Sequence, residues 1–120
     1  MLLDKMNIQI NNKLSKAASF TIERFFVPED TAGIKLNLQV PSDYINFVLL
    51  YDSAYNLRAE ITQFQGGREI RVHELDYLTS PGAKKGVIPS GEWILAFEFN
   101  EYEINESINC IVEVSAQRSQ

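Results

Sequence analysis

The 120-residue chain contains a single cysteine, Cys110, and a single histidine, His73. One cysteine excludes an intrachain disulfide, and one histidine excludes the multi-histidine sites that often hold a catalytic metal ion. No apolar run approaches the roughly 18 residues that a membrane-spanning helix requires. The segment MLLDKMNIQI has Asp4 and Lys5 after only two leucines, so it lacks the apolar region of a signal peptide. We therefore expect a cytoplasmic chain.

Clustered positive charge is also scarce. The chain has 11 Lys and Arg residues against 16 Asp and Glu residues, and its formal net charge is -5. The only adjacent basic pair is Lys84-Lys85. Because binding to phosphates requires clustered Lys and Arg, this distribution argues against nucleic acid and against an anionic membrane surface as partners.

The sequence lacks the common catalytic motifs. It contains no G-x-x-x-x-G-K-[ST] loop, no G-x-S-x-G elbow and no calcium-loop spacing. Cys110 falls on the apolar side of its strand, which predicts a buried side chain, and His73 falls on the polar side, which predicts a surface side chain. We therefore predict a non-enzyme with no catalytic residue, no metal ligand and no cofactor.

What the chain does contain is alternation of apolar and polar residues, the period of half-buried strands. Turn residues separate these stretches. The pattern predicts strands at about 17–27, 33–40, 44–52, 57–64, 68–73, 86–88, 91–102 and 106–115, with a ninth at 6–11. It favours an all-β, antiparallel, jelly-roll-like sandwich of eight to nine strands. We expect one domain over 17–116, an amino-terminal extension or edge strand at 1–16 and a tail at 117–120.

The expected core contains Trp93, with Phe97, Leu36 and Val112 on the same interior side of their strands. In SFTIERFFV the apolar positions change side between Ile22 and Phe25. This change predicts a β-bulge or a strand that crosses between sheets.

The segment SPGAKKGVIPSGEW, residues 80–93, departs from the alternation. A glycine-rich anion-binding loop leads into the amino terminus of a helix, but the residues after Gly91 form a predicted strand. Pro81-Gly82 instead predicts a type II turn with a positive φ at Gly82, and Pro89-Ser90-Gly91 predicts a second turn. We interpret the segment as a structural loop that places Trp93 in the core.

Residues 79–93 also resemble the pattern A-T-P-G-x-x-P-G-x-[IL]-P-x-G-x-W of the amino-terminal domain of carbaryl-hydrolase-like (CehA/McbA-type) metallohydrolases of the PHP superfamily. The matching positions are Pro81, Gly82, Gly86, Pro89, Gly91 and Trp93. FFVPEDTAGIKLNLQV (25–40), VLLYDSAYNLRAE (48–60) and QGGREIRV (65–72) are similar to other segments of that domain. Ala83 replaces a common aromatic, Lys85 a proline, and Ser53 and Tyr55 the proline and glycine of a turn.

The resemblance implies a β-sandwich accessory domain and no catalytic residue, because the family's metal ligands lie in H-x-H motifs of a following domain. The implied partner is a metallohydrolase catalytic domain, in cis or in trans.

Two functional hypotheses follow. The first is an accessory or interaction module that docks on such a domain or self-associates as a dimer. Its partner surface would form if three strands with apolar residues on both faces were neighbours, and its residues are Val48, Leu50, Ile94, Ala96 and Ile111. The second is a small-molecule or carbohydrate-binding sandwich with aromatic stacking platforms. Its candidate residues are Tyr51, Tyr55, Tyr77 and Tyr102.

Overall fold

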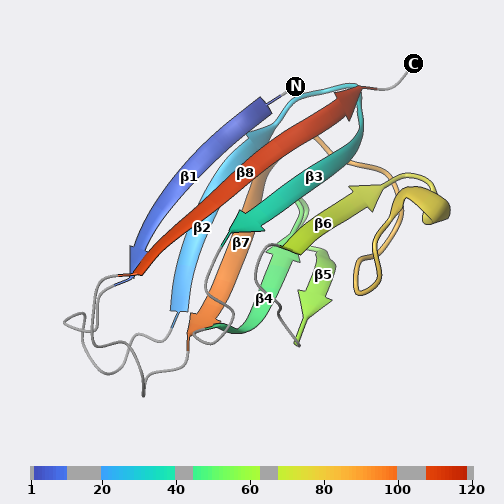
Figure 1. The fold of residues 1–120 in the computed structure, drawn as a ribbon. Coiled ribbons are helices and arrows are strands. Elements are labelled where there is room, and N and C mark those ends of the chain that lie inside the picture. The colour runs from blue at the N-terminus through green and yellow to red at the C-terminus, as the bar shows by residue number, and fades with distance from the viewer. Residues whose placement is uncertain (1, 11–19, 40–44, 63–67, 100–107, 119–120) are drawn as a thin grey trace.

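The computed structural model describes residues 2–10, 20–39, 45–62, 68–99 and 108–118 (Figure 1). Within these ranges the backbone forms eight strands and a short 3-10 turn. The elements are β1 (Leu2–Ile10), β2 (Phe20–Val27), β3 (Thr31–Gln39), β4 (Ile45–Tyr51), β5 (Leu57–Ile61), β6 (Arg68–His73), η2 (Asp76–Leu78), β7 (Gly91–Phe99) and β8 (Ile108–Arg118).

The strands form two antiparallel four-stranded sheets (Figure 1). One sheet has the order β1-β8-β3-β6 and the other β2-β7-β4-β5. Successive strands alternate between the sheets, except for the pair β4 and β5, which are neighbours in one sheet. This strand order is that of a jelly roll. The antiparallel sandwich that the alternation predicts is therefore confirmed.

Several strand predictions need correction. Residues 86–88 form no strand, and nearby only an isolated bridge links Ala59 with Ala83. The ninth strand, expected at 6–11, is part of β1, an edge strand that pairs with β8. The pairing of β2 with β7 runs without a register shift from Phe20 to Val27, so no bulge follows Ile22. The side chain of Ile22 is instead exposed. The last strand, β8, continues beyond its predicted end at residue 115, as far as Arg118.

The core lies between the sheets and is built from alternate residues of strands in both. Trp93, Leu36 and Val112 are fully buried, and Phe97 is 1% exposed. These burials confirm the expected interior set. The indole Nε1–H of Trp93 donates to the carbonyl of Pro89 at 2.9 Å. The tryptophan therefore loses no hydrogen bond when it is buried.

The loop between β6 and β7 covers the edge strand of each sheet on one side of the sandwich. The Ser80 N–H donates to the Arg71 carbonyl on β6 at 3.0 Å, and the Glu60 N–H on β5 donates to the Gly82 carbonyl at 2.9 Å. Unpaired strand edges are open to pairing with other chains. The loop therefore satisfies backbone groups of β5 and β6 and joins the two sheets.

Substitution of Trp93 tests this packing. Trp93→Ala removes the largest fully buried side chain of the core, and we expect it to lower the free energy of unfolding by about 3–5 kcal/mol. Ile22→Ala, on an exposed side chain, is the control and should change it by less than about 0.5 kcal/mol. Urea unfolding measures both values. Native emission of this single tryptophan at the wavelength of an exposed indole would contradict the assignment.

Candidate functional site

The loop before β7 is organised around the buried guanidinium of Arg58. Nη1 donates to Asp52 Oδ2 at 3.2 Å and to the Val87 carbonyl at 2.8 Å. Nη2 donates to the carbonyls of Lys84 at 3.2 Å and Gly86 at 3.1 Å, and Nε donates to the Lys84 carbonyl at 3.3 Å. These bonds use all five N–H donors of the guanidinium. The loop therefore presents carbonyl oxygens to a cation, which agrees with the structural interpretation of residues 80–93.

Asp52 supplies the negative charge opposite Arg58. Its Oδ1 accepts the backbone N–H groups of Ala54 at 2.9 Å and Asn56 at 3.0 Å, and its Oδ2 accepts Arg58. Burial of the carboxyl raises its pKa, but hydrogen bonds from Asn56, Ala54 and Arg58 outweigh burial and lower the pKa below its ordinary value of 3.8. Asp52 is therefore ionised at neutral pH and balances the buried guanidinium.

The same cluster reaches the core through Trp93, since the Arg58 guanidinium lies 5.5 Å from the centre of the indole ring. This is the range of a cation–π contact. Gly82 has φ 86° and the Ala83 N–H donates to the Ser80 carbonyl at 3.1 Å, which confirms the predicted turn at Pro81-Gly82. Trp93 thus contacts the ion pair directly, whereas the Pro81-Gly82 turn lies against Glu60 on β5.

Tyr55 lies in the turn between β4 and β5, where the resembled pattern has a glycine. Its φ is 65°, in the left-handed region that favours glycine. The Tyr55 N–H donates to the Asp52 carbonyl at 2.9 Å, which closes the turn. The side chain is 77% exposed. The turn therefore keeps a glycine-like backbone although the residue is a tyrosine.

The outer faces of the two sheets differ in character. Polar side chains cover the outer face of β1-β8-β3-β6, where Lys5 lies 3.8 Å from Glu113 and Arg71 lies 3.4 Å from Glu69. On β2-β7-β4-β5 the outward positions are mainly apolar. We call this surface the outer apolar face, and its residues are Ile22, Phe26, Phe47, Leu49, Tyr51, Ile94 and Ala96.

Strand register makes the outer apolar face continuous. Ile22 on β2 pairs with Ala96 on β7, which pairs with Leu49 on β4, so the three side chains form a row across the sheet. Phe26 is 67% exposed and Ile22 is 54% exposed. Large exposed apolar side chains that adjoin one another mark interaction surfaces more often than isolated ones do. This face is the candidate functional site.

The predicted partner surface is only partly present: Ile94 is half-buried and Ala96 is only 9% exposed, although both lie on the outward side of β7. Val48 and Leu50 are 1% and 0% exposed and belong to the core, which corrects their assignment to the surface. Ile111 is on β8, in the other sheet, so it does not adjoin Ile94 and Ala96 on β7. The physical reason is that β4 is apolar on both sides, so alternation alone does not identify its inward side.

The four candidate ligand-binding tyrosines do not form a described pocket. Tyr51 is half-buried on the outer apolar face, and Tyr77 on η2 is 77% exposed. Tyr102 lies outside the described residues. Among pockets lined by described residues, three contain no tyrosine.

The prediction of a surface position for His73 is wrong. His73 is only 9% exposed, because its ring lies against the backbone of Gly33.

Cys110 pairs with Ile8 in the register of β8 and β1, and its side chain lies outside the described part. Among the described side chains, no group of three His, Cys, Asp or Glu residues has an arrangement that could hold a metal ion. The described ranges also include no helix long and apolar enough to cross a membrane.

Comparison with known proteins adds no family assignment. No family model matches the chain, and no curated protein matches its sequence.

The buried ion pair can be tested by removing its cation. Arg58→Met leaves the Asp52 carboxylate buried without its partner, and we expect a loss of about 3–5 kcal/mol in unfolding free energy. Arg24→Met is the matched control, because Arg24 and Glu92 form an exposed pair at 3.3 Å that should contribute less than about 1 kcal/mol. Equal effects of the two substitutions in urea unfolding would contradict a central role for Arg58.

The lowered pKa of Asp52 gives a test by pH. A carboxyl whose pKa is lower in the folded state stabilises the fold above its unfolded pKa, and this contribution is lost as the pH falls through the folded value. Asp52→Asn should therefore destabilise most above pH 3.8, the ordinary value, and the difference from wild type should shrink at lower pH. Urea unfolding across this range measures it. A difference that stays constant into strong acid would show that Asp52 acts by shape alone.

Proposed function

We propose that this chain is a non-catalytic interaction module that binds protein through the outer apolar face. The observation that carries the proposal is the contrast between the two sheets. One outer face bears paired charges such as Lys5 with Glu113, whereas the other exposes Phe26 and Ile22 beside further apolar side chains. Association that buries such a face is favoured by roughly 25 cal/mol per Å² of apolar area, before the entropic costs of binding.

The size of the face fits a modest protein interface. β2 has 8 residues and β7 has 9. With a rise of about 3.3 Å per residue and three spacings of about 4.8 Å between strands, the face measures at most roughly 27 by 14 Å, because β4 and β5 are shorter. A standard interface buries about 800 Å² of accessible surface on each partner. The projected area is within a factor of about two of that value, and protruding side chains such as Phe26 add to it.

For the isolated chain, we infer that the occupant of this face is a second copy. Two β-sheets pack face to face by interdigitating apolar side chains, as they do inside a sandwich, and a two-fold contact brings the same patch together from both copies. Arg24 and Glu92 neutralise each other at 3.3 Å within the face. A second copy therefore meets apolar surface, this balanced ion pair and two further outward carboxylates, Glu60 beside Leu49 and Glu98 beside Phe47.

The resemblance to the amino-terminal domain of PHP-type metallohydrolases supports the accessory role. In that family the sandwich accompanies a catalytic domain that carries the metal ligands. A metallohydrolase catalytic domain, in the same polypeptide or a separate one, is the heterologous partner that the resemblance suggests. The dispersed positions of Tyr51, Tyr55 and Tyr77 give less support to a carbohydrate site on aromatic platforms.

Sedimentation velocity tests the proposal. We expect the wild-type chain to dimerise and Phe26→Glu to weaken dimerisation at least about tenfold, because it places a charge in the apolar interface. Val87→Glu is the control, since Val87 is 76% exposed on the loop and lies outside the outer apolar face. It should leave dimerisation unchanged.

A wild-type chain that stays monomeric at about 1 mM, where association contributes less than about 4 kcal/mol, would overturn self-docking. Binding of a purified metallohydrolase domain that Phe26→Glu abolishes would then assign the face to that partner. Dimerisation that Phe26→Glu leaves unchanged would place the interface elsewhere, and equal loss in both variants would show a general effect of added charge rather than docking through this face.

A further inference from the structure

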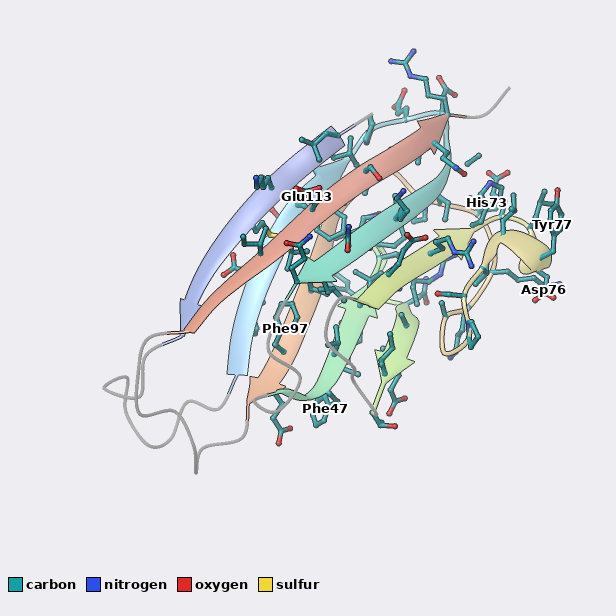
Figure 2. The ribbon with its side chains drawn as sticks, viewed as in Figure 1. Phe47, His73, Asp76, Tyr77, Phe97 and Glu113 are labelled. Carbon is teal, nitrogen blue, oxygen red and sulfur yellow. The ribbon has the colours of Figure 1, made fainter. Side chains whose placement is uncertain are left out.

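A groove lies on the polar sheet, at the end where β3, β6 and β8 meet the turn η2. Its volume is about 730 Å³, and the residues that matter here are His73, Leu75, Leu78, Gln117 and Arg118. A smaller hollow of about 70 Å³ shares His73, Leu78 and Gln117 with it. We call the two together the His73 groove. Figure 2 shows His73 at the end of β6, beside the turn that carries Asp76 and Tyr77.

The floor of the groove exists because one residue lacks a side chain. Gln117 on β8, Gly33 on β3 and His73 on β6 form a row across the sheet. A Cβ atom on Gly33 would collide with Cδ2 of the His73 ring. Glycine therefore lets the imidazole approach the backbone of β3 closely, beside the groove.

Hydrogen bonding orients the ring toward this space. His73 Nδ1 accepts the Leu75 N–H at 3.0 Å, so in the neutral imidazole the proton is on Nε2. No hydrogen bond joins Nε2 to another described residue. No fully buried side-chain nitrogen in the described part lacks a hydrogen-bond partner, so Nε2 keeps some accessible surface, and His73 lines the groove. A side chain that is only 9% exposed therefore presents one free N–H donor.

Charge around the groove is mainly positive, although the chain as a whole carries -5. Arg118 lines the larger part, and Lys35 and Arg71 line the smaller one. Glu74 contributes one negative charge to the rim of the groove. Arg71 also forms an ion pair with Glu69, with 3.4 Å between Nε and Oε1. The opposite wall is apolar.

That wall is formed by Leu75 and Leu78, and Leu75 is 47% exposed. A largely buried hydrogen-bond donor, nearby cations and an apolar wall together suit a ligand that has an anionic group attached to an apolar part. We propose that the His73 groove binds a small organic anion. Its carboxylate or phosphate accepts the Nε2–H of His73 and pairs with Arg118, and its apolar part packs on Leu75 and Leu78. The groove belongs to the other sheet from the outer apolar face, so this site is independent of the docking proposal.

Nuclear magnetic resonance tests the tautomer first. His73 is the only histidine, so long-range proton–nitrogen correlations report its ring without ambiguity. We expect the pattern of the Nε2–H tautomer at neutral pH. The opposite tautomer would remove the donor from the groove and overturn the proposal.

Binding is then tested by titrating the chain with 3-phenylpropionate, phenyl phosphate and the neutral 3-phenylpropan-1-ol. We expect both anions to shift the amide signals of Gly33, Leu75 and Leu78, and the alcohol to bind at least about tenfold more weakly, because it lacks the charge. The stronger of the two anions identifies the head group. No shift with either anion, or equal binding of the alcohol, would refute an anion site.

Matched variants locate the site. Arg118→Gln should weaken anion binding by about tenfold. Lys5→Gln removes the same charge from β1, at the far edge of this sheet, and should leave binding unchanged. Thermal unfolding of both variants checks that they fold. Equal loss in the two variants would show general charge attraction and would refute the groove as the site.

Discussion

A buried guanidinium must find an acceptor for each of its N–H groups, and Arg58 meets this requirement with five hydrogen bonds. One acceptor is the Asp52 carboxylate and the others are carbonyl oxygens of the loop before β7. An unpaired donor in this position would cost the full desolvation energy of a charged group. The path of the loop is therefore fixed by Arg58, and so is the entry of β7 into its sheet. Trp93 lies directly below the guanidinium, at 5.5 Å from ring centre to cation, and the core forms around it.

The Arg58 cluster acts at one side of the sandwich, where its loop joins the two sheets. The loop that it organises provides hydrogen bonds to the β5 and β6 edges, as in the contact from Ser80 N–H to the Arg71 carbonyl. The other two edge strands are β1 and β2, and the two outer faces differ in the side chains that their strands carry. One face carries exposed ion pairs such as Lys5 with Glu113. The other carries Phe26 and Ile22 with little charge between them, because Arg24 is neutralised by Glu92.

Most of the fold could be predicted from the sequence. In a strand whose residues alternate between polar and apolar, the apolar side is the one that faces the core. The alternation around Trp93, Leu36 and Val112 identified the core, and residues 68–73 were predicted as β6 without error. The candidate site was harder to predict. INFVLLY is apolar on both sides, so nothing local separates the buried Val48 from the outward Leu49. Sheet membership depends on pairing between distant strands, which is why Ile111 was grouped with Ile94 although the two lie on different sheets.

His73 and Arg58 show a second limit of local patterns. Both follow the polar side of a strand, and both are buried by segments distant in sequence: Gly33 for the histidine and residues 84–87 for the arginine. Glycine in the middle of a strand is the one sequence signal that could have indicated the first, since it permits close approach of another group. The two burials are also connected, because the Gly86 N–H donates to the His73 carbonyl at 3.1 Å. The loop that enfolds Arg58 thus holds the end of β6, and through it the floor of the His73 groove. The loop around the buried ion pair thus contributes one hydrogen bond to the end of β6, where the proposed ligand site lies.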